Sequence, residues 1–258
     1  MTDTIIVMPC YNEARRLNPA PLRDFLIRQS RCALLMADDG SSDQTLQVLE
    51  TLREQIPGQV GVHRLEEHRG KAEAVRQGIL RAFDLGPRLI AYWDADLATP
   101  LETIPQYIAV MDRLQEVQMV IGCRIPLLGH AIQRRPLRRW MGRVFSRTAS
   151  SVLGVPVYDT QCGAKIFRAT DFTRALFAEP FRSAWIFDVE ILARMRVALG
   201  RQDMSRRIYE FPLESWHEVP GSKLKARDFL KATWELAAIY WTCLRPRGLT
   251  VKDRPLPR

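Results

Sequence analysis

The chain has 258 residues, of which 47% are hydrophobic, and a formal net charge of +9. This length and composition allow a full core and favour one large α/β domain. The five cysteines are odd in number and widely spaced, with no C-x-x-C pair. They therefore argue against a disulfide framework or a zinc site and favour a reducing cytoplasm.

Residues 4–122 alternate short β-rich runs with segments of helical period. We predict strands at 4–8, 32–37, 60–65, 89–93 and 118–122, and helices near 19–30, 43–55, 71–84 and 101–114. Ser41 and Gln44 have the spacing of a capping box for the second helix. The alternation predicts right-handed crossovers and a mainly parallel sheet with helices on both faces.

The pattern changes beyond residue 125, where the chain becomes strongly basic. Residues 117–158 contain no Asp or Glu but seven arginines. The spacing predicts a basic amphipathic helix over 136–153, with Arg139, Arg143 and Arg147 on one face. Such a block favours an anionic partner: nucleic acid, an acidic membrane surface or a phosphorylated substrate. The chain lacks a recognition motif or aromatic platform for nucleic acid, so we expect no nucleic-acid partner.

The last third predicts further elements and no membrane span. We expect a strand within 160–169, a helix near 186–199, a strand at 207–213, a final helix near 229–244 and a loose tail over 246–258. The final helix contains Lys231 and Glu235 and falls short of the roughly 20 apolar residues that a bilayer span needs. The acidic start of the chain and its short apolar run argue against a signal peptide.

Polar groups follow every strand of the predicted parallel sheet. They are Pro9 to Glu13, Asp38 to Gly40, Glu66 to Lys71, Asp94 with Asp96, and Arg124. Ligands bind beyond the carboxyl ends of strands in such sheets, so we place the active face at this edge.

The stretch AYWDADLATP places Asp94 and Asp96 at the end of a predicted buried strand. In a turn the two carboxylates can converge on one cation. Mg²⁺ binds through one or two carboxylates plus substrate phosphates, which suggests a nucleotide diphosphate. Ordinary turn acids would have the same spacing. Asp38 and Asp39 have similar alternatives, a turn with a helix cap or an acceptor for a base N–H or ribose hydroxyls.

Six stretches carry a resemblance to a known enzyme family. They are PCYNE (9–13), DDGSSD (38–43), HRGKAEAVRQGI (68–79), DADLAT (94–99), TQCGAKIF (160–167) and WIFDVE (185–190). In this order and spacing they resemble the inverting GT-A glycosyltransferases of family 2 over roughly residues 4–225. DTQCGAKIFRA, FDVEIL and VPGSKL look like the dolichyl-phosphate glucose synthase branch, whose members transfer a sugar from a nucleotide to a polyprenyl phosphate.

The resemblance implies a domain division and a donor. It implies a GT-A catalytic domain over 1–225, an amphipathic membrane-interface or packing helix over 226–245, and the loose tail. Ala98 stands where the related mannose synthases often carry a polar residue, which favours UDP-glucose over GDP-mannose as donor.

The resemblance also implies roles for individual residues. Binding of the nucleotide sugar would involve Pro9, Tyr11, Glu13, Asp38, Asp39, Lys71, Asp94, Ala95, Gln161 and Lys223. Asp94 and Asp96 would coordinate Mg²⁺ or Mn²⁺ on the diphosphate. Lys71 occupies the family's G-K-G position, although Ala72 replaces the second glycine. His217 is a weaker candidate for contact with the metal or diphosphate.

Three residues are expected at the reacting groups. Asp188 has the position of the general base in relatives that glycosylate hydroxyls. A phosphate monoester has a second pKa of about 6 and needs no such base, so Asp188 would instead orient the acceptor or the sugar. A helix N-terminal acid is the structural alternative. Arg124 and Arg138 are the expected contacts of the acceptor phosphate.

A lipid acceptor implies a location and a docking surface. We expect a cytoplasmic protein, peripheral on the cytoplasmic face of the membrane, whose arginine stripe faces anionic headgroups and whose final helix lies in the interface. For the arginine stripe, the alternative is a solvated helix face. For the final helix, the alternatives are an oligomer contact or a deeply packed helix. The oligomeric state stays open. The competing functions are a soluble relative that glycosylates a hydroxyl and a non-catalytic domain that binds nucleotide sugar or membrane.

Overall fold

The computed structural model describes residues 2–134, 136–219 and 226–244. In chain order the elements are β1 (Thr4–Cys10), α1 (Pro19–Arg28), β2 (Cys32–Asp38), α2 (Thr45–Gln55), β3 (Val60–Arg64), α3 (Lys71–Phe83), β4 (Leu89–Trp93), α4 (Thr103–Arg113), β5 (Met119–Cys123), β6 (Ala131–Gln133), α5 (Pro136–Leu153), β7 (Ala164–Arg168), α6 (Asp171–Ala178), α7 (Phe187–Arg207), β8 (Ile208–Pro212), β9 (Ser215–His217), α8 (Ala226–Ile239) and the π-helix η1 (Tyr240–Leu244).

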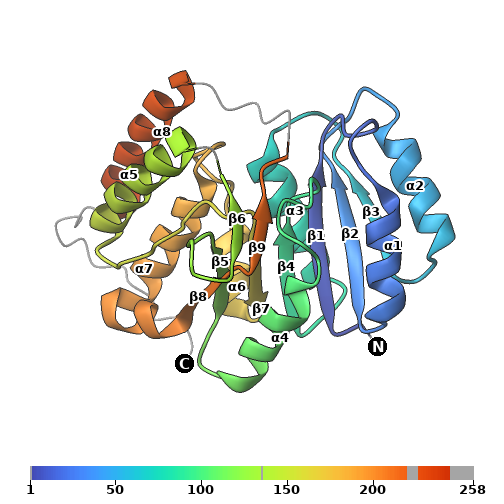
Figure 1. Cartoon of the computed structure of the whole chain (residues 1–258), viewed down its shortest axis with the longest axis horizontal. Coiled ribbons are helices and arrows are strands. Elements are labelled where there is room, and N and C mark those ends of the chain that lie inside the picture. The colour runs from blue at the N-terminus through green and yellow to red at the C-terminus, as the bar shows by residue number, and fades with distance from the viewer. Residues whose placement is uncertain (1, 135, 220–225, 245–258) are drawn as a thin grey trace.

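A seven-stranded sheet of order β3-β2-β1-β4-β7-β5-β8 forms the middle of the molecule (Figure 1). β7 runs antiparallel to both of its neighbours, and the other pairs in this sheet are parallel. The fold class predicted from the alternating pattern, a mainly parallel sheet flanked by helices, is therefore confirmed.

Two apolar clusters cover the two faces of this sheet. On β1, Ile5 and Val7 belong to the cluster that receives α3, α5, α6, α7 and α8, whereas Ile6 and Met8 belong to the cluster that receives α1, α2 and α4. Successive side chains of a strand point to opposite faces, and both faces are covered here. This explains why the central strands read as unbroken apolar runs.

Some local predictions were wrong. α7 continues past residue 199 to Arg207, with a break at Gly200 whose φ is +77°. The capping box does not form, because Gln44 makes no side-chain cap and the Ser41 hydroxyl accepts from Asn12 N at 3.0 Å. The helix α6 and the small parallel pair of β6 with β9 were not predicted.

The helix α8 has one packed face and one exposed face. Ala232, Leu236 and Ile239 are buried in the same cluster as α5 and α7, whereas Trp234 is 80% exposed; Trp241, on the following η1, is 57% exposed. Figure 1 shows α5 and α8 together at one end of the sheet. Within the described ranges, every helix is too short or too polar to cross a membrane. The predicted tail over 246–258 lies outside the described residues.

Candidate active site

The loops that follow β1 and β2 are held together by one asparagine. Asn12 has a φ of +53°, in the left-handed region that asparagine tolerates better than most residues. Its Oδ1 accepts from Ser42 N at 2.9 Å and Asp43 N at 3.3 Å. These bonds fix the PCYNE and DDGSSD stretches beside each other at the carboxyl edge of the sheet.

The adjacent acids Asp38 and Asp39 have different surroundings. Asp39 accepts from Arg69 N and Gly70 N at 2.8 Å and pairs with His68 Nδ1 at 2.8 Å. It therefore anchors the loop that leads into α3. The buried Asp38 Oδ2 has no hydrogen-bond partner among the described residues and only a long ion pair of 3.8 Å with Arg64.

An aromatic pair lies beside these acids. The ring of His68 stacks on Tyr11 with centroids 3.7 Å apart and an interplanar angle of 19°. Sequence reasoning selected Tyr11 and missed His68. No local pattern marks His68 for this role, because its stacking partner lies far away in the chain.

The D-x-D turn is held in a defined shape. Asp94 N donates to Gly163 O at 2.9 Å, and Asp96 Oδ1 accepts from Ala98 N at 3.1 Å. Leu97 has a φ of +53°, a conformation that is rare for such a residue and that clusters at functional sites. A Cβ at Gly163 would overlap the carboxyl group of Asp94. Glycine at this position is therefore required for the carboxylate to lie where it does.

Charges of both signs meet at this turn. Lys71 Nζ lies 2.5 Å from Asp94 Oδ1. Burial lowers the pKa of Lys71, but the acids Asp94, Asp188 and Asp96 outweigh it and raise that pKa overall. Burial, and then the charge of Asp94, raise the pKa of Asp96. Asp94 thus lies close enough to Asp96 to disfavour the charge of Asp96, which is the situation that a bound cation relieves.

The residues fit a divalent cation that is shared with a substrate. Within the described ranges, no group of three or more His, Cys, Asp or Glu could hold a metal ion. Mg²⁺ usually needs only one or two carboxylates when substrate phosphates complete its coordination. Asp94 Oδ1 is buried and pairs with the Lys71 ammonium at 2.5 Å, so this oxygen already faces a positive charge where a metal ion would bind.

A cavity of about 510 Å³ opens beside the turn. Its lining includes Lys71, Asp94, Asp96 and Asp188, and also Arg124, Arg134, Arg138 and Arg143. Apolar side chains of α5 and of the start of α7, together with Ala232 of α8, line it as well. The cavity therefore brings acidic, basic and apolar side chains together.

Arg124 lines this cavity but is already paired. Its Nε and Nη2 donate to Asp159 at 2.6 and 2.8 Å, and its guanidinium lies over the ring of Trp216. Burial opposes the charge of Asp159, but Arg124 outweighs it and lowers the pKa of Asp159 to about 2. Glu210 accepts from the backbone of Tyr158 and Asp159 and so holds this acid in place.

Two further arginines lie near this pair. Arg138 Nη1 donates to Glu218 at 2.5 Å. Arg134 also lies over Trp216, 5.7 Å from the ring centroid, and burial followed by the charge of Arg124 lowers its pKa. Burial and the neighbouring positive charge both disfavour the charged form of Arg134, and an anionic ligand would offset both effects. Arg134 was missed as a candidate, and its place in the acid-free block was the available signal.

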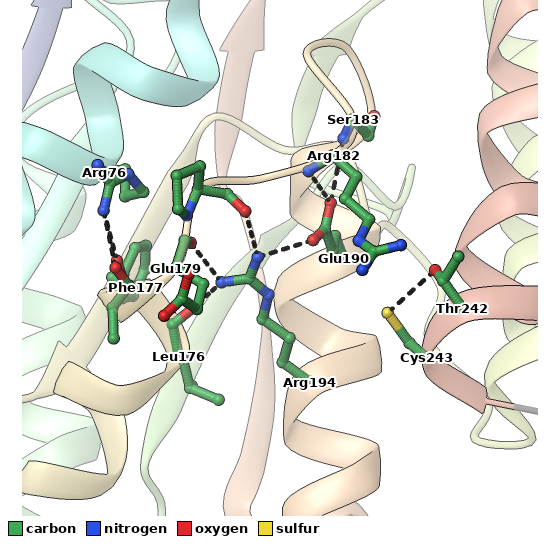
Figure 2. A network of polar contacts seen from close by, with 12 residues as sticks. Arg76, Leu176, Phe177, Glu179, Arg182, Ser183, Glu190, Arg194, Thr242 and Cys243 are labelled. Carbon is green, nitrogen blue, oxygen red and sulfur yellow. Dashed lines mark hydrogen bonds and ion pairs between the residues drawn. The ribbon is translucent and has the colours of Figure 1, made fainter. Parts of the chain in front are cut away.

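A polar network fixes the segment that leads into α7 (Figure 2). Glu190 accepts from Arg182 N and Ser183 N at 2.9 and 3.1 Å, and Arg194 donates to Glu190 and to three backbone carbonyls. The Ser183 hydroxyl also donates to Glu235 of α8. The first turn of α7, which carries Asp188, is thereby held in place against the cavity.

The predicted site residues fall into three groups. The cavity brings together Lys71, Asp94, Asp96, Arg124, Arg138, Gln161 and Asp188. Pro9, Tyr11, Glu13, Asp38, Asp39 and Ala95 do not line this cavity; they lie at or just beyond the carboxyl ends of β1, β2 and β4. Lys223 lies outside the described residues. His217 is exposed and does not line the cavity, although its backbone N donates to Ala98 O.

Comparison with known proteins agrees with these features. Residues 5–174 match the family model described as glycosyl transferase family 2. The chain is 31% identical to a dolichyl-phosphate beta-glucosyltransferase of Trichomonas vaginalis, over 97% of this chain and 74% of that protein. It is 30% identical to a dolichyl-phosphate beta-glucosyltransferase of Saccharomyces cerevisiae, over 91% of this chain and 73% of that protein.

A solved structure shares the fold. A glucosyl-3-phosphoglycerate synthase of Mycobacterium tuberculosis, in complex with Mn²⁺, UDP and glucosyl-3-phosphoglycerate, matches with a TM-score of 0.66 at 17% identity, over 96% of this chain and 82% of that one. This likeness confirms the GT-A fold expected from the motifs. With a family model that matches 170 of its residues, 5–174, the chain belongs to glycosyl transferase family 2.

Proposed function

We propose that this protein transfers glucose from UDP-glucose to a polyprenyl phosphate at a membrane surface, with inversion at the anomeric carbon. The observation that carries the proposal is one cavity whose lining combines the D-x-D carboxylates with four arginines and with apolar side chains. The names of the relatives from Trichomonas vaginalis and Saccharomyces cerevisiae, dolichyl-phosphate beta-glucosyltransferases, support the same assignment.

The D-x-D carboxylates that line the cavity suit the donor. Asp94 and Asp96 would hold Mg²⁺ or Mn²⁺ against the diphosphate, and Lys71, 2.5 Å from Asp94, would add a second positive charge. A bound metal ion would stabilise the charge that develops on the departing diphosphate. Tyr11, with His68 stacked on it, and the nearby Asp38 would bind the nucleoside at the adjoining strand ends.

The arginines that line the cavity suit a phosphate acceptor. Arg124 uses two of its five N–H donors on Asp159, which leaves the others for an anion. Arg138 and Arg134 line the same cavity, and the apolar wall beside them would take the first part of a lipid chain. A phosphate oxygen held there would attack the anomeric carbon from the side opposite the leaving diphosphate, which inverts the configuration.

Asp188→Asn is expected to separate a phosphate acceptor from a hydroxyl acceptor. Transfer to a polyprenyl phosphate should fall only about 10- to 100-fold, as expected when one hydrogen bond to a charged group is lost, because the phosphate needs no general base. An enzyme that glycosylates a hydroxyl would lose its base and fall by up to about 10,000-fold. The measurement is the initial rate of glucose transfer to each acceptor; loss of phosphate transfer below detection would contradict the proposal.

The surface around the cavity suits a membrane. α5 carries the exposed residues Trp140, Arg139 and Arg147, and α8 carries the exposed Trp234. Tryptophan favours the membrane interface, and each arginine near an anionic surface contributes about 1 kcal/mol of binding free energy. We propose that this face lies on the cytoplasmic leaflet, with the lipid phosphate entering the cavity between α5 and α8.

A charge variant tests this docking. Arg139→Gln/Arg147→Gln should lower retention on vesicles that contain phosphatidylglycerol by about 30-fold, because two favourable charges are lost. Arg23→Gln/Arg53→Gln, with the same change of charge on α1 and α2, serves as the control and should bind as the wild type does. Equal losses in both pairs would show that net charge alone drives binding and would contradict the proposed face.

A further inference from the structure

A buried lysine lies behind the active site without touching the cavity. Lys165 is fully buried on β7, where its neighbours Ala164 and Ile166 face the opposite apolar cluster. In the β4–β7 pairing it lies directly across from Tyr92. An ammonium group in such a core position carries a large desolvation penalty, so its retention calls for specific partners.

The ammonium group of Lys165 is fully occupied. Nζ donates to Cys162 O at 2.5 Å and to the Tyr92 hydroxyl at 2.9 Å, and it lies 2.8 Å from Asp188 Oδ1. An ammonium group has three N–H donors, and all three are accounted for. Lys165 is also absent from the cavity wall. It therefore acts on other residues of the protein and not on a substrate.

The partners of Lys165 fix one oxygen of Asp188. The Tyr92 hydroxyl donates to the same Oδ1 that pairs with Lys165. Oδ2 makes no hydrogen bond or ion pair with any residue in the described ranges, and Asp188 lines the cavity. With Oδ1 held from two directions, the carboxyl plane cannot rotate freely. Oδ2 is then the oxygen left for a ligand.

The chemistry of Oδ2 selects what it can bind. An ionised carboxylate oxygen accepts hydrogen bonds and donates none. The acceptor phosphate and the diphosphate are anions, largely deprotonated at neutral pH, and a carboxylate repels them. The hydroxyls of the hexose are donors.

We propose that Lys165 and Tyr92 are positioning residues that hold Asp188 so that its Oδ2 binds a hydroxyl of the transferred hexose. The inference rests on the proposed donor, UDP-glucose, but not on the proposed acceptor. It assigns recognition of the sugar to a cross-strand pair in the core: Tyr92 on β4, two residues before Asp94, and Lys165 on β7, three residues after Cys162.

The test compares affinities for UDP-glucose and for UDP, by calorimetric titration with Mn²⁺ on the full chain. Asp188→Asn and Lys165→Met should each weaken UDP-glucose binding about 10- to 100-fold, the loss expected for a hydrogen bond to a charged group, and should leave UDP binding within about threefold. Tyr92→Phe removes one oxygen atom and should weaken UDP-glucose binding by a smaller factor. In the double variant Lys165→Met/Asp188→Asn, the second change should add nothing, because both act through one carboxylate.

The control removes a cation from the same helix as Asp188. Arg196 donates to Leu153 O at 3.1 Å and does not line the cavity, so Arg196→Met should lower thermal stability and leave the ratio of the two affinities unchanged. If Lys165→Met does not fold, the ratio of the UDP-glucose and UDP affinities of Tyr92→Phe decides whether the positioning role holds.

The outcomes separate this inference from the proposed function. Folded variants whose UDP-glucose to UDP ratio equals that of the wild type, or whose effects multiply in the double variant, would overturn the positioning role. Wild-type binding without transfer to a polyprenyl phosphate would overturn only the proposed acceptor.

Discussion

Replacing Asp96 with asparagine is expected to lower the rate of glucose transfer by about 100- to 1,000-fold, the effect typical of losing one group that stabilises transition-state charge. Asp96 lies in the turn after β4, partly buried, where burial and Asp94 raise its pKa. A neutral amide would leave the cation with one carboxylate in place of two. The metal ion would then bind more weakly and neutralise the departing diphosphate less well.

The measurement is the initial rate of transfer at several Mn²⁺ concentrations. The concentration of Mn²⁺ for half-maximal rate should rise in Asp96→Asn, and the maximal rate should still fall. Asp24→Asn, on α1 and exposed, is the control and should change neither value. A variant that keeps more than a tenth of the wild-type rate at all metal concentrations would contradict the role given to Asp96.

Replacing Arg124 with methionine is expected to lower the free energy of unfolding by about 3–5 kcal/mol, the usual consequence of removing one partner of a buried ion pair. The side chains of Arg124 and Asp159 are 12% and 6% exposed. Asp159 would keep its charge in a buried place without its bidentate partner. Urea denaturation followed by circular dichroism measures the change.

An exposed ion pair supplies the control. Arg28 and Glu102 are 60% and 68% exposed, so Arg28→Met should change the free energy of unfolding by less than about 1 kcal/mol. Similar values for the two variants would contradict the structural role of the buried pair.

The buried pair of Arg124 and Asp159 also makes the free energy of unfolding depend on pH, with a definite sign. The pKa of Asp159 is lowered to about 2 in the folded protein, against about 3.9 for an ordinary aspartate. Its contribution to stability is therefore fully present above about pH 4 and is lost as the pH falls toward 2.

Much of the fold could be predicted because its signals are local. Each strand from β1 to β5 is a short apolar run that ends in polar residues, and the alternation with helices fixes parallel crossovers. The basic helix was predicted over 136–153 and observed as Pro136–Leu153, since a spacing of four residues among its arginines defines one face. Asp94 and Asp96 were predicted from their place after a buried strand together with the family resemblance of the six stretches, and both line the cavity.

The parts that were missed depend on contacts between distant segments. Lys165 reads in sequence as an ordinary strand residue, and only the antiparallel pairing of β7 with β4 places it beside Tyr92. Asp159 could not be assigned to Arg124, because 35 residues separate them. The capping box at Ser41 failed for a related reason: the hydroxyl bonds the loop after β1, which no local pattern reveals.

Transfer of glucose to a lipid phosphate can be tested in one incubation. The full chain is mixed with UDP-glucose, Mn²⁺ and a polyprenyl phosphate, and the organic phase is analysed for glucose linked to lipid phosphate. We expect a lipid-linked product of inverted anomeric configuration that disappears in Asp96→Asn. Failure of a panel of nucleotide sugars to give any lipid-linked product, with either Mg²⁺ or Mn²⁺, would contradict it.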